Sequence, residues 1–330
     1  MELYYTEDGK VSKYIHDNGA ETTIKTTSSC NNTLNKTTGE IETIKNDKNK
    51  FSVFISSSVG CPLGCKFCYL TQNKFPYRKL SSKEIIDNVK EALISEIEHN
   101  PSIRKKYIKL SWMGMGDALL LEPYTFRKIN EEILDWVLGD MGFAWGLDGI
   151  DLSTILPKAQ HKGGWPHQLS NLNDYCNHSH RMNPANTFRS AVRLFYSLHF
   201  LDHRDLYIPG GSPYGVRSDL KYLAKVTDWY GIDLIIHHIF FEGLNDSLGR
   251  NFYDDAQQLY SAISKYADGC ELRILRYNGC EGSKFRESTN FNELLKLYID
   301  IFPKIKYQIS SGSEIKAACG QFIGLTNRKK

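Results

Sequence analysis

Residues 58–69 decide how the rest of this chain is organised, and they read Ser-Val-Gly-Cys-Pro-Leu-Gly-Cys-Lys-Phe-Cys-Tyr. Three residues separate Cys61 from Cys65, and two separate Cys65 from Cys68. Thiolate is the ligand that iron–sulfur clusters take, and a closed [4Fe–4S] cluster needs four cysteines. A loop with three cysteines therefore predicts a cluster in which one iron is left open to an outside ligand.

A zinc site and a chance grouping of core cysteines are the two alternatives to a cluster. A zinc site would need a fourth cysteine or a histidine nearby, but none lies within fifteen residues on either side. Three cysteines of a hydrophobic core could also stand this close by coincidence. We prefer the cluster because of the motifs that follow it along the chain.

The composition is ordinary for a globular protein. The 330 residues are 41% hydrophobic and 24% charged, and this length fits one large α/β barrel or two smaller domains. No apolar run reaches the ~20 residues of a membrane span, and the first residues lack the pattern of a signal peptide. Eight cysteines, three of them in one motif, predict a reducing cytoplasm rather than a disulfide scaffold. The net charge of +3 neither requires nor excludes nucleic acid.

From about residue 51, segments with strand character alternate with segments of helical periodicity. The expected strands are Phe51–Ser56, Tyr107–Met113, Gly149–Thr154, a strand within Phe188–Leu198, Asp233–Glu242, Glu271–Tyr277 and Lys304–Ser310. The expected helices are Ser81–Asn100 behind a serine cap, Thr125–Leu138, Ser218–Tyr230, Phe252–Tyr266 and Asn290–Ile301. This alternation predicts an α/β fold with a parallel sheet, whose site lies at the carboxyl ends of the strands.

Two segments fall outside the alternation. Residues 1–50 are polar, and their β-like pieces Gly19–Thr27 and Glu40–Lys45 predict a short β-rich extension. Residues 157–187 have few apolar positions and hold four histidines together with Trp165 and Cys176. A loop this long predicts a polar lid over the active-site face, and a metal site made by its histidines and cysteine is the alternative.

Small polar motifs follow several of the expected strands. They are Gly114-Met115-Gly116-Asp117, Ser153-Thr154, Ser197-Leu198-His199 and Gly243-Leu244-Asn245-Asp246. Each by itself is a weak signal, because tight turns and generic polar residues are common where strands end.

The most specific motif lies near the end of the chain, where residues 312–322 read Gly-Ser-Glu-Ile-Lys-Ala-Ala-Cys-Gly-Gln-Phe. The cluster loop, with Phe67 before its last cysteine, resembles that of the radical S-adenosylmethionine (SAM) enzymes. From about Ser52 to Gly324, the motifs together resemble in order and spacing the RlmN/Cfr family of radical SAM RNA adenosine methyltransferases. The resemblance implies a partial, laterally open (β/α)6 radical SAM barrel, with a [4Fe–4S] cluster and SAM as cofactors.

The resemblance also implies roles for individual residues. Cys61, Cys65 and Cys68 would hold the cluster, whose open iron would chelate the amino and carboxylate groups of SAM. Gly116 would let the backbone approach the SAM ammonium group, from which Asp117 would accept a charge-assisted hydrogen bond. The remaining cofactor-binding residues would be Phe67, Ser153, Ser197, His199 and Asn245.

By the same resemblance, Cys319 is a methyl carrier. One SAM molecule would methylate its thiolate, and a second would yield a 5′-deoxyadenosyl radical that takes a hydrogen atom from the new S-methyl group. The resulting methylene radical would add to an electron-poor sp2 carbon, which in the family is an amidine carbon of adenine in RNA. The alternative is that Cys319 is a buried structural cysteine, a common role for a free thiol.

The chain departs from the family pattern in two respects. Phe54 occupies the position, seven residues before the first cluster cysteine, at which the family carries the cysteine that resolves its covalent adduct. Cys280 is our candidate for that catalytic role, with Cys176 second. The β-like extension 1–50 also differs from the helical accessory domain that precedes the family's barrel, which weakens the transfer of an RNA substrate.

We therefore expect a methyltransferase acting on an adenine-containing substrate, either RNA or a smaller nucleotide-like molecule, with a flavodoxin- or ferredoxin-type electron donor and no membrane partner. The expected divisions are the extension 1–50, the barrel 51–312 with its lid 157–187, and the segment 313–330. One alternative is a radical SAM enzyme that acts on a peptide or small metabolite without methyl transfer from Cys319. Another is a non-catalytic iron–sulfur binding protein.

Overall fold

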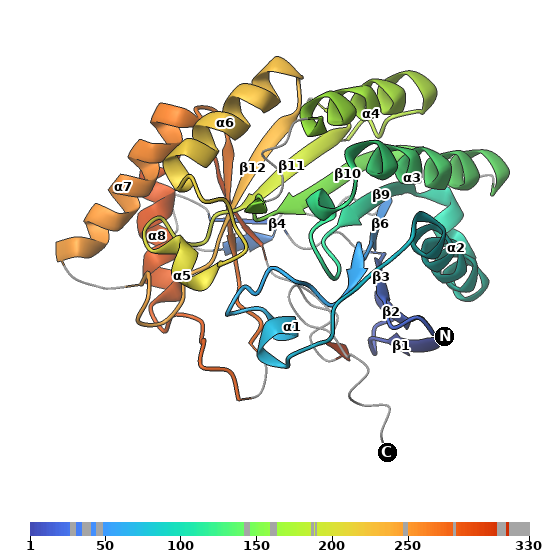
Figure 1. Ribbon diagram of the computed structural model, residues 1–330, viewed down its shortest axis with the longest axis horizontal. Helices are drawn as coiled ribbons and strands as arrows, with labels where there is room; N and C mark the ends of the chain where they lie inside the picture. Colours follow the sequence, from blue (N-terminus) through green and yellow to red (C-terminus); the bar gives the residue numbers. More distant parts are fainter. Residues whose placement is uncertain are drawn as a thin grey trace.

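The computed structural model describes residues 1–26, 31–34, 41–43, 49–141, 146–158, 164–185, 188, 190–246, 250–279, 282–308 and 315–316; for 31–34, 41–43 and 250–254 only the backbone is described. A curved sheet forms its centre, and the long helices pack on the outer face of that sheet (Figure 1). The expected α/β fold is confirmed.

Seven strands of the described chain pair in parallel, and they correspond to the seven strands expected from the alternation; the (β/α)6 barrel implied by the resemblance has six. Their order is β6-β9-β10-β11-β12-β13-β14, and the sheet does not close between β6 and β14. The strands are buried on both faces, as is usual for parallel sheets covered by helices; β9, for example, has five of its six residues buried. They are β6 (Lys50–Phe54), β9 (Tyr107–Trp112), β10 (Leu147–Thr154), β11 (Val192–Ser197), β12 (Asp233–His238), β13 (Glu271–Leu275) and β14 (Ile305–Gln308).

Helices connect these strands, and the five expected ones, α2, α3, α6, α7 and α8, lie within a few residues of their expected bounds. At the start of α2, Ser81 Oγ accepts from the Glu84 amide (3.2 Å) and the Glu84 carboxylate accepts from the Ser81 amide (2.8 Å), a reciprocal cap that confirms the predicted start. The helices are α1 (Tyr69–Gln72), α2 (Ser82–His99), α3 (Pro123–Asp135), α4 (Trp165–Ser179), α5 (Arg204–Tyr207), α6 (Val216–Trp229), α7 (Arg250–Tyr266) and α8 (Phe291–Ile301), with short turns at Pro101–Lys105, Ala118–Leu120 and Trp136–Asp140.

The N-terminal extension adds antiparallel strands to both edges of the parallel sheet. β1 (Glu2–Tyr5), β2 (Val11–Ile15) and β3 (Glu21–Lys25) continue the sheet beyond β6, whereas β4 (Asn31–Leu34) and β5 (Ile41–Thr43) continue it beyond β14. A separate two-stranded ribbon, β7 (Ser58–Val59) with β8 (Arg78–Lys79), flanks the cysteine loop. The extension is β-rich, as the sequence predicted.

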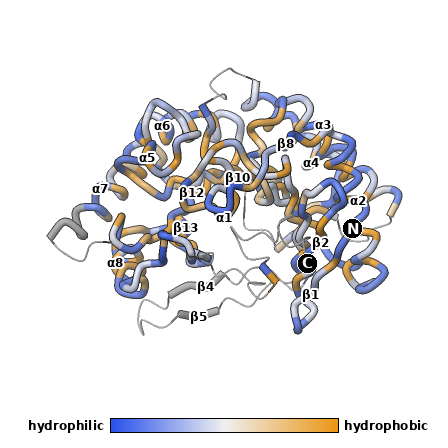
Figure 2. Tube along the Cα trace, turned by 60° about the horizontal axis from the view of Figure 1, so that its bottom comes forward, coloured by the Kyte–Doolittle hydropathy of each residue, from blue (hydrophilic) through white to orange (hydrophobic). Residues whose placement is uncertain are grey.

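The extension shares the core of the barrel. Tyr14 of β2 and Ile24 of β3 belong to the same buried cluster as Tyr298 of α8, and the Tyr14 hydroxyl donates to the buried Glu96 carboxylate of α2 (2.7 Å). Hydrophobic residues concentrate along the strands and the inward sides of the helices (Figure 2). No helix within the described residues is long and apolar enough to cross a membrane.

The predicted lid loop is wrong for its central part. Residues 165–179 form α4 instead, which packs against α3 and β11. Trp165, Leu172 and Cys176 are buried on its inner face. The helical spacing of these apolar positions is hard to recognise in the sequence, because polar residues and histidines separate them. Within its described part, this segment completes the βαβ alternation between β10 and β11.

Charged side chains fill the barrel interior below the active-site end. Asp151 of β10 accepts from Arg193 Nε of β11 (2.5 Å) and pairs with Lys109 Nζ of β9 (3.2 Å). Burial alone would raise the pKa of Asp151, but Arg193 and Lys109 outweigh it and hold that pKa at about 2. Side chains two residues apart share a face of a strand, so Ser153 lies above Asp151 and these charges form the layer under the pocket.

We predict that Asp151→Asn destabilises the protein by about 3–5 kcal/mol, because it leaves buried cations without their counter-charge. Urea denaturation at pH 7 measures the free energy of unfolding. Lys83→Ala is the control, since Lys83 pairs with Asp87 on the surface of α2 and should cause no measurable change. Equal stability of Asp151→Asn and wild type would contradict this account of the barrel interior.

Candidate functional site

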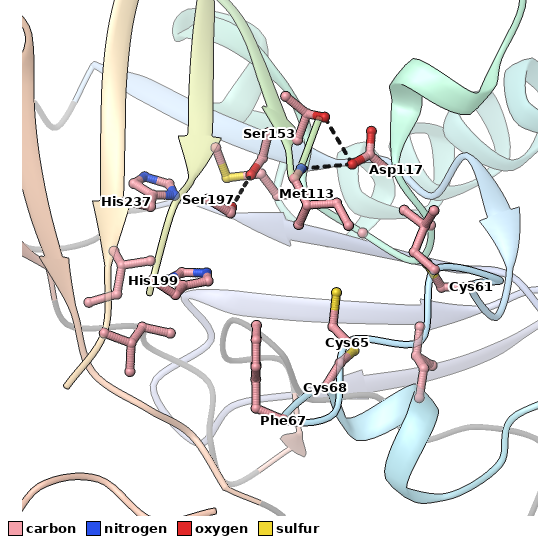
Figure 3. Close-up of a pocket in the computed structure, with 18 of the residues that line it drawn as sticks. Cys61, Cys65, Phe67, Cys68, Met113, Asp117, Ser153, Ser197, His199 and His237 are labelled. Carbon is pink, nitrogen blue, oxygen red and sulfur yellow. Dashed lines mark hydrogen bonds between the residues drawn. The ribbon is translucent and has the colours of Figure 1, made fainter. Parts of the chain in front are cut away.

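A pocket lies at the carboxyl ends of the parallel strands, facing the cysteine loop. Nine of the ten expected cluster and cofactor residues line it: Cys61, Cys65, Phe67, Cys68, Gly116, Asp117, Ser153, Ser197 and His199. In Figure 3 the cysteines and Phe67 come from the loop on one side, whereas Asp117, the serines and the histidines come from strand ends on the other. The fold thus brings together residues that are far apart in the sequence.

The cysteine loop is fixed by backbone hydrogen bonds to the far side of the barrel. The Lys66 amide donates to the Tyr207 carbonyl (2.9 Å), and the Gly210 amide donates to the Leu63 carbonyl (3.0 Å). From the end of β13, the Tyr277 hydroxyl donates to the Phe67 carbonyl (2.9 Å). These hydrogen bonds fix the position of the cysteine loop beside the pocket.

The three thiols suit a cluster better than a single metal ion. Within the described residues, no three Cys, His, Asp or Glu side chains are grouped closely enough to hold one ion. The cysteines of a cluster bind different iron atoms, so they need not converge on one point. Burial raises the pKa of Cys61 to about 12 and also raises the pKa of Cys65 well above its usual value. Both are therefore thiols at neutral pH unless a metal displaces the proton.

Phe67 is the centre of an aromatic group beside the cysteines. Its ring lies edge-on to His199 with 5.2 Å between the ring centroids, and at the same distance from the ring of Phe241. Phe200 and Phe285 lie further out in the same group. These contacts give the residue before the last cysteine a packing role, which limits water at one wall of the pocket.

The Gly114–Asp117 loop approaches the chain that leads into the cysteine loop. The Met115 amide donates to Ser56 Oγ (3.0 Å), and the Ser57 amide donates to the Met115 carbonyl (2.9 Å). A Cβ atom at Gly116, where φ is +88°, would lie 2.3 Å from Ser58 Oγ. Close packing against the serines therefore requires a glycine at position 116.

Asp117 is buried and bonded to the end of β10. One carboxylate oxygen accepts from the Leu119 amide (3.0 Å), and the other accepts from Thr154 Oγ1 (3.0 Å) and from the Ile155 amide (2.9 Å). Burial raises the pKa of Asp117 from 3.8 to about 6, although these hydrogen bonds partly oppose the shift. The Asp117 carboxyl group is therefore mostly ionised at neutral pH, and a modest fall in pH would protonate it.

The strand side of the pocket carries polar groups that can form further hydrogen bonds. Ser153 and Ser197 lie at the ends of β10 and β11 with 3.3 Å between their hydroxyl oxygens. His199 Nδ1 and His237 Nε2 are buried and have no hydrogen-bond partner within the described residues. Burial lowers the pKa of both histidines, that of His237 to about 3, so each imidazole is neutral. Such orphaned atoms fit a polar ligand that supplies their partners.

Among the residues not assigned from the sequence, His237 lines the pocket and Arg204 supports the strand ends beside it. His237 is a polar residue on the same face of β12 as the apolar Ile235 and Ile239, and that break in the pattern could have revealed it. Arg204 is buried and donates to the carbonyls of Ile155 (3.0 Å) and Ser197 (2.9 Å), which ties the ends of β10 and β11 together. Its local sequence gives no such signal, because polar residues surround it.

Asn245 differs from its expected role, since it does not line the pocket. Its Nδ2 donates to the carbonyls of His199 (2.8 Å) and Ile239 (2.9 Å), and its Oδ1 accepts from the Phe241 amide (2.6 Å). Both amide hydrogens are thus used within the protein. Asn245 holds His199 in its left-handed conformation, with φ of 54°, and acts on the pocket through that residue.

The remaining candidates lie elsewhere. Cys280 and Cys319 fall outside the described residues. Cys176 is fully buried under α4, where burial raises the pKa of its thiol far above the usual value, so it is not available to resolve an adduct. Phe54 ends β6 with its ring under the ammonium of Lys25, 5.1 Å from Nζ to the ring centroid.

We predict that Asp117→Asn removes part of the pH dependence of stability. A raised folded-state pKa favours the folded state when the group is protonated, so the contribution of Asp117 is full below pH 3.8 and is lost as pH rises through about 6. Urea denaturation across pH 3.5–7 should show the wild type losing about 3 kcal/mol more than the variant over this range. Parallel curves for the two proteins would contradict the raised pKa.

No family model matches the chain. Over 297 residues it is 28% identical to a probable dual-specificity RNA methyltransferase RlmN of Chlorobium phaeobacteroides, covering 86% of this chain and 69% of that protein. It is 26% identical to the RlmN of Buchnera aphidicola over 298 residues, covering 87% and 71% of the two chains.

The fold agrees with these sequence similarities. A radical SAM methyltransferase from Sphaerobacter thermophilus superimposes with a TM-score of 0.65 at 19% identity, covering 97% of this chain and 80% of that one. The resemblance inferred from the motifs is confirmed: the chain is similar over most of its length to proteins named RlmN, and its fold matches that of a solved radical SAM methyltransferase.

Proposed function

We propose that this chain is a radical SAM RNA methyltransferase that methylates an sp2 carbon of adenine through Cys319. One observation carries the proposal: the three-cysteine loop faces Asp117, Ser153 and Ser197 across one pocket at the strand ends, in a chain similar to RlmN proteins along most of its length.

The residues present fit a [4Fe–4S] cluster and SAM. Cys61, Cys65 and Cys68 would hold the cluster, and the unfilled hydrogen-bonding capacity of His199 and His237 fits a ligand rich in polar atoms. When bound, the two cofactors supply the radical chemistry that ordinary side chains lack. The aromatic wall at Phe67 limits access of water to that chemistry.

The chain's own residues orient SAM. The Asp117 carboxylate offers a negative charge to the ammonium group, although it already accepts three hydrogen bonds, so it would act mainly as a fixed charge. The Ser153 and Ser197 hydroxyls can each donate or accept, which suits ribose hydroxyls. Arg204 and Asn245 keep the strand ends bearing these groups in place.

Cys319 is the proposed methyl carrier. Its thiolate would take the methyl group of SAM by displacement, with the electron pair of the broken bond left on the sulfur of S-adenosylhomocysteine. The methylated side chain would then carry that carbon to the substrate once the radical supplied by a second SAM had removed one of its hydrogen atoms. Because Phe54 cannot form a disulfide and Cys176 is buried, Cys280 remains our candidate for resolving the adduct.

We predict that Cys319 acquires a methyl group from SAM. The protein is reconstituted with iron and sulfide without oxygen, incubated with methyl-labelled SAM, digested and mapped by mass spectrometry. Label should appear at Cys319 and disappear in Cys319→Ala, whereas Cys270→Ala, a half-buried cysteine that does not line the pocket, should label like wild type. Formation of 5′-deoxyadenosine with an unlabelled Cys319 would indicate a different reaction class.

We predict that RNA accepts the label. Unmodified RNA is incubated with the enzyme, labelled SAM and a chemical reductant, then digested to nucleosides. A methyladenosine with its new methyl group on a ring carbon is the expected product, and Cys65→Ala should form none because it lacks a cluster ligand. Label that appears in a peptide or small-molecule fraction, and not in RNA, would reject RNA as the substrate.

A further inference from the structure

A lysine is buried in the N-terminal sheet, away from the pocket residues described so far. Lys13 of β2 has only 1% of its side chain exposed, and its Nζ lies 2.7 Å from Oε2 of Glu21 on β3, whose side chain is 2% exposed. Lys13 pairs with Thr23 in the register, so Glu21 is a diagonal neighbour on the same face of the sheet. A buried ion pair adds little stability over an apolar pair of similar volume, which suggests a role other than stability.

The Lys13 ammonium reaches the C-terminal segment. It donates a hydrogen bond to the backbone carbonyl of Lys316, a residue with φ of 51°. Non-glycine residues seldom adopt this left-handed conformation. The hydrogen bond from Lys13 therefore helps to stabilise a turn that is unfavourable by itself. Lys316 precedes Cys319 by three residues, and their Cα atoms are therefore no more than about 11 Å apart.

Glu21 connects the same contact to the pocket. Its backbone carbonyl accepts from Ser56 Oγ (2.6 Å), and Ser56 Oγ in turn accepts from the amide of Met115 (3.0 Å). Met115 lies two residues before Asp117 in the glycine loop. A continuous set of polar contacts therefore runs from that loop through the buried residues Glu21 and Lys13 to the turn at Lys316.

We infer that Lys13 and Glu21 are a positioning pair that sets the C-terminal segment, and with it Cys319, relative to the Asp117 loop. This inference rests on the proposed carrier role of Cys319. The pair does not line the pocket, and it acts through the Lys316 carbonyl. The N-terminal strands thereby contribute to methyl transfer from outside the barrel.

The test removes the contact without leaving a buried charge. Lys13→Met alone would strand the Glu21 carboxylate, so the main variant is the double change Lys13→Met/Glu21→Gln, which keeps the backbone bond to Ser56. The matched control is Lys106→Met, since Lys106 Nζ also donates to a backbone carbonyl of the N-terminal extension, that of Thr26 (3.1 Å). Urea denaturation first establishes that each protein is folded.

Three quantities are compared. Displacements of about 1 Å can cost 10²-fold in rate, so the initial rate of Cys319 methylation should fall at least about tenfold in the double variant and not in Lys106→Met. SAM affinity, measured by equilibrium dialysis, should be equal in all three proteins. Amide hydrogen exchange in peptides spanning residues 313–320 should be faster in the double variant alone, because their anchor is lost.

The results separate this inference from the proposed function. A double variant that methylates Cys319 at the wild-type rate overturns the positioning role. If wild type leaves Cys319 unmethylated, the carrier mechanism fails, and hydrogen exchange decides about the pair: faster exchange at residues 313–320 supports the anchoring contact, and unchanged exchange overturns it.

Discussion

The rest of the site depends on one contact, in which the glycine loop (residues 114–117) packs against the serine segment (residues 56–58). Met115 exchanges hydrogen bonds with Ser56 and Ser57, and this contact joins the ends of two adjacent parallel strands. One strand leads into the cysteine loop and the other into Asp117. Because both loops leave the sheet at this contact, the position of the cysteines relative to the carboxylate follows from it. A Cβ atom on either Gly114 or Gly116 would lie within 2.7 Å of an atom of the serine segment.

Buried ionisable side chains lie at two levels of the barrel interior. The lower level holds Asp151 with Arg193 and Lys109, where opposite charges satisfy one another. The upper level holds the neutral histidines His199 and His237, whose ring nitrogens lack partners within the described residues. The paired charges below give a rigid support, and the histidine nitrogens above keep hydrogen-bonding capacity for a ligand. The same interior is therefore structural at one end and suited to binding at the other.

Residue type and spacing were enough to select nine residues that lie around one pocket, namely the three closely spaced cysteines and residues of the motifs that follow strands. The roles expected for these residues stay predictions. Asn245 was assigned to the pocket because its motif follows a strand, yet its amide is used by the backbone. Arg204 was missed because its role depends on two carbonyls more than six residues away in sequence. The helix α4 was missed because polar residues and histidines separate its buried positions.

The sequence by itself determined the alternation of strands and helices, the start of α2 and the close spacing of the three cysteines, because each depends on periodicity or on groups within a few residues. Only the tertiary structure decided that the N-terminal extension covers both edges of the parallel sheet and that Lys13 reaches the carbonyl of Lys316. These residues are separated by almost the whole chain, and no local propensity encodes their pairing. Which buried group meets which partner is set by the packing of the complete sheet, where an unpaired charge is too costly to remain.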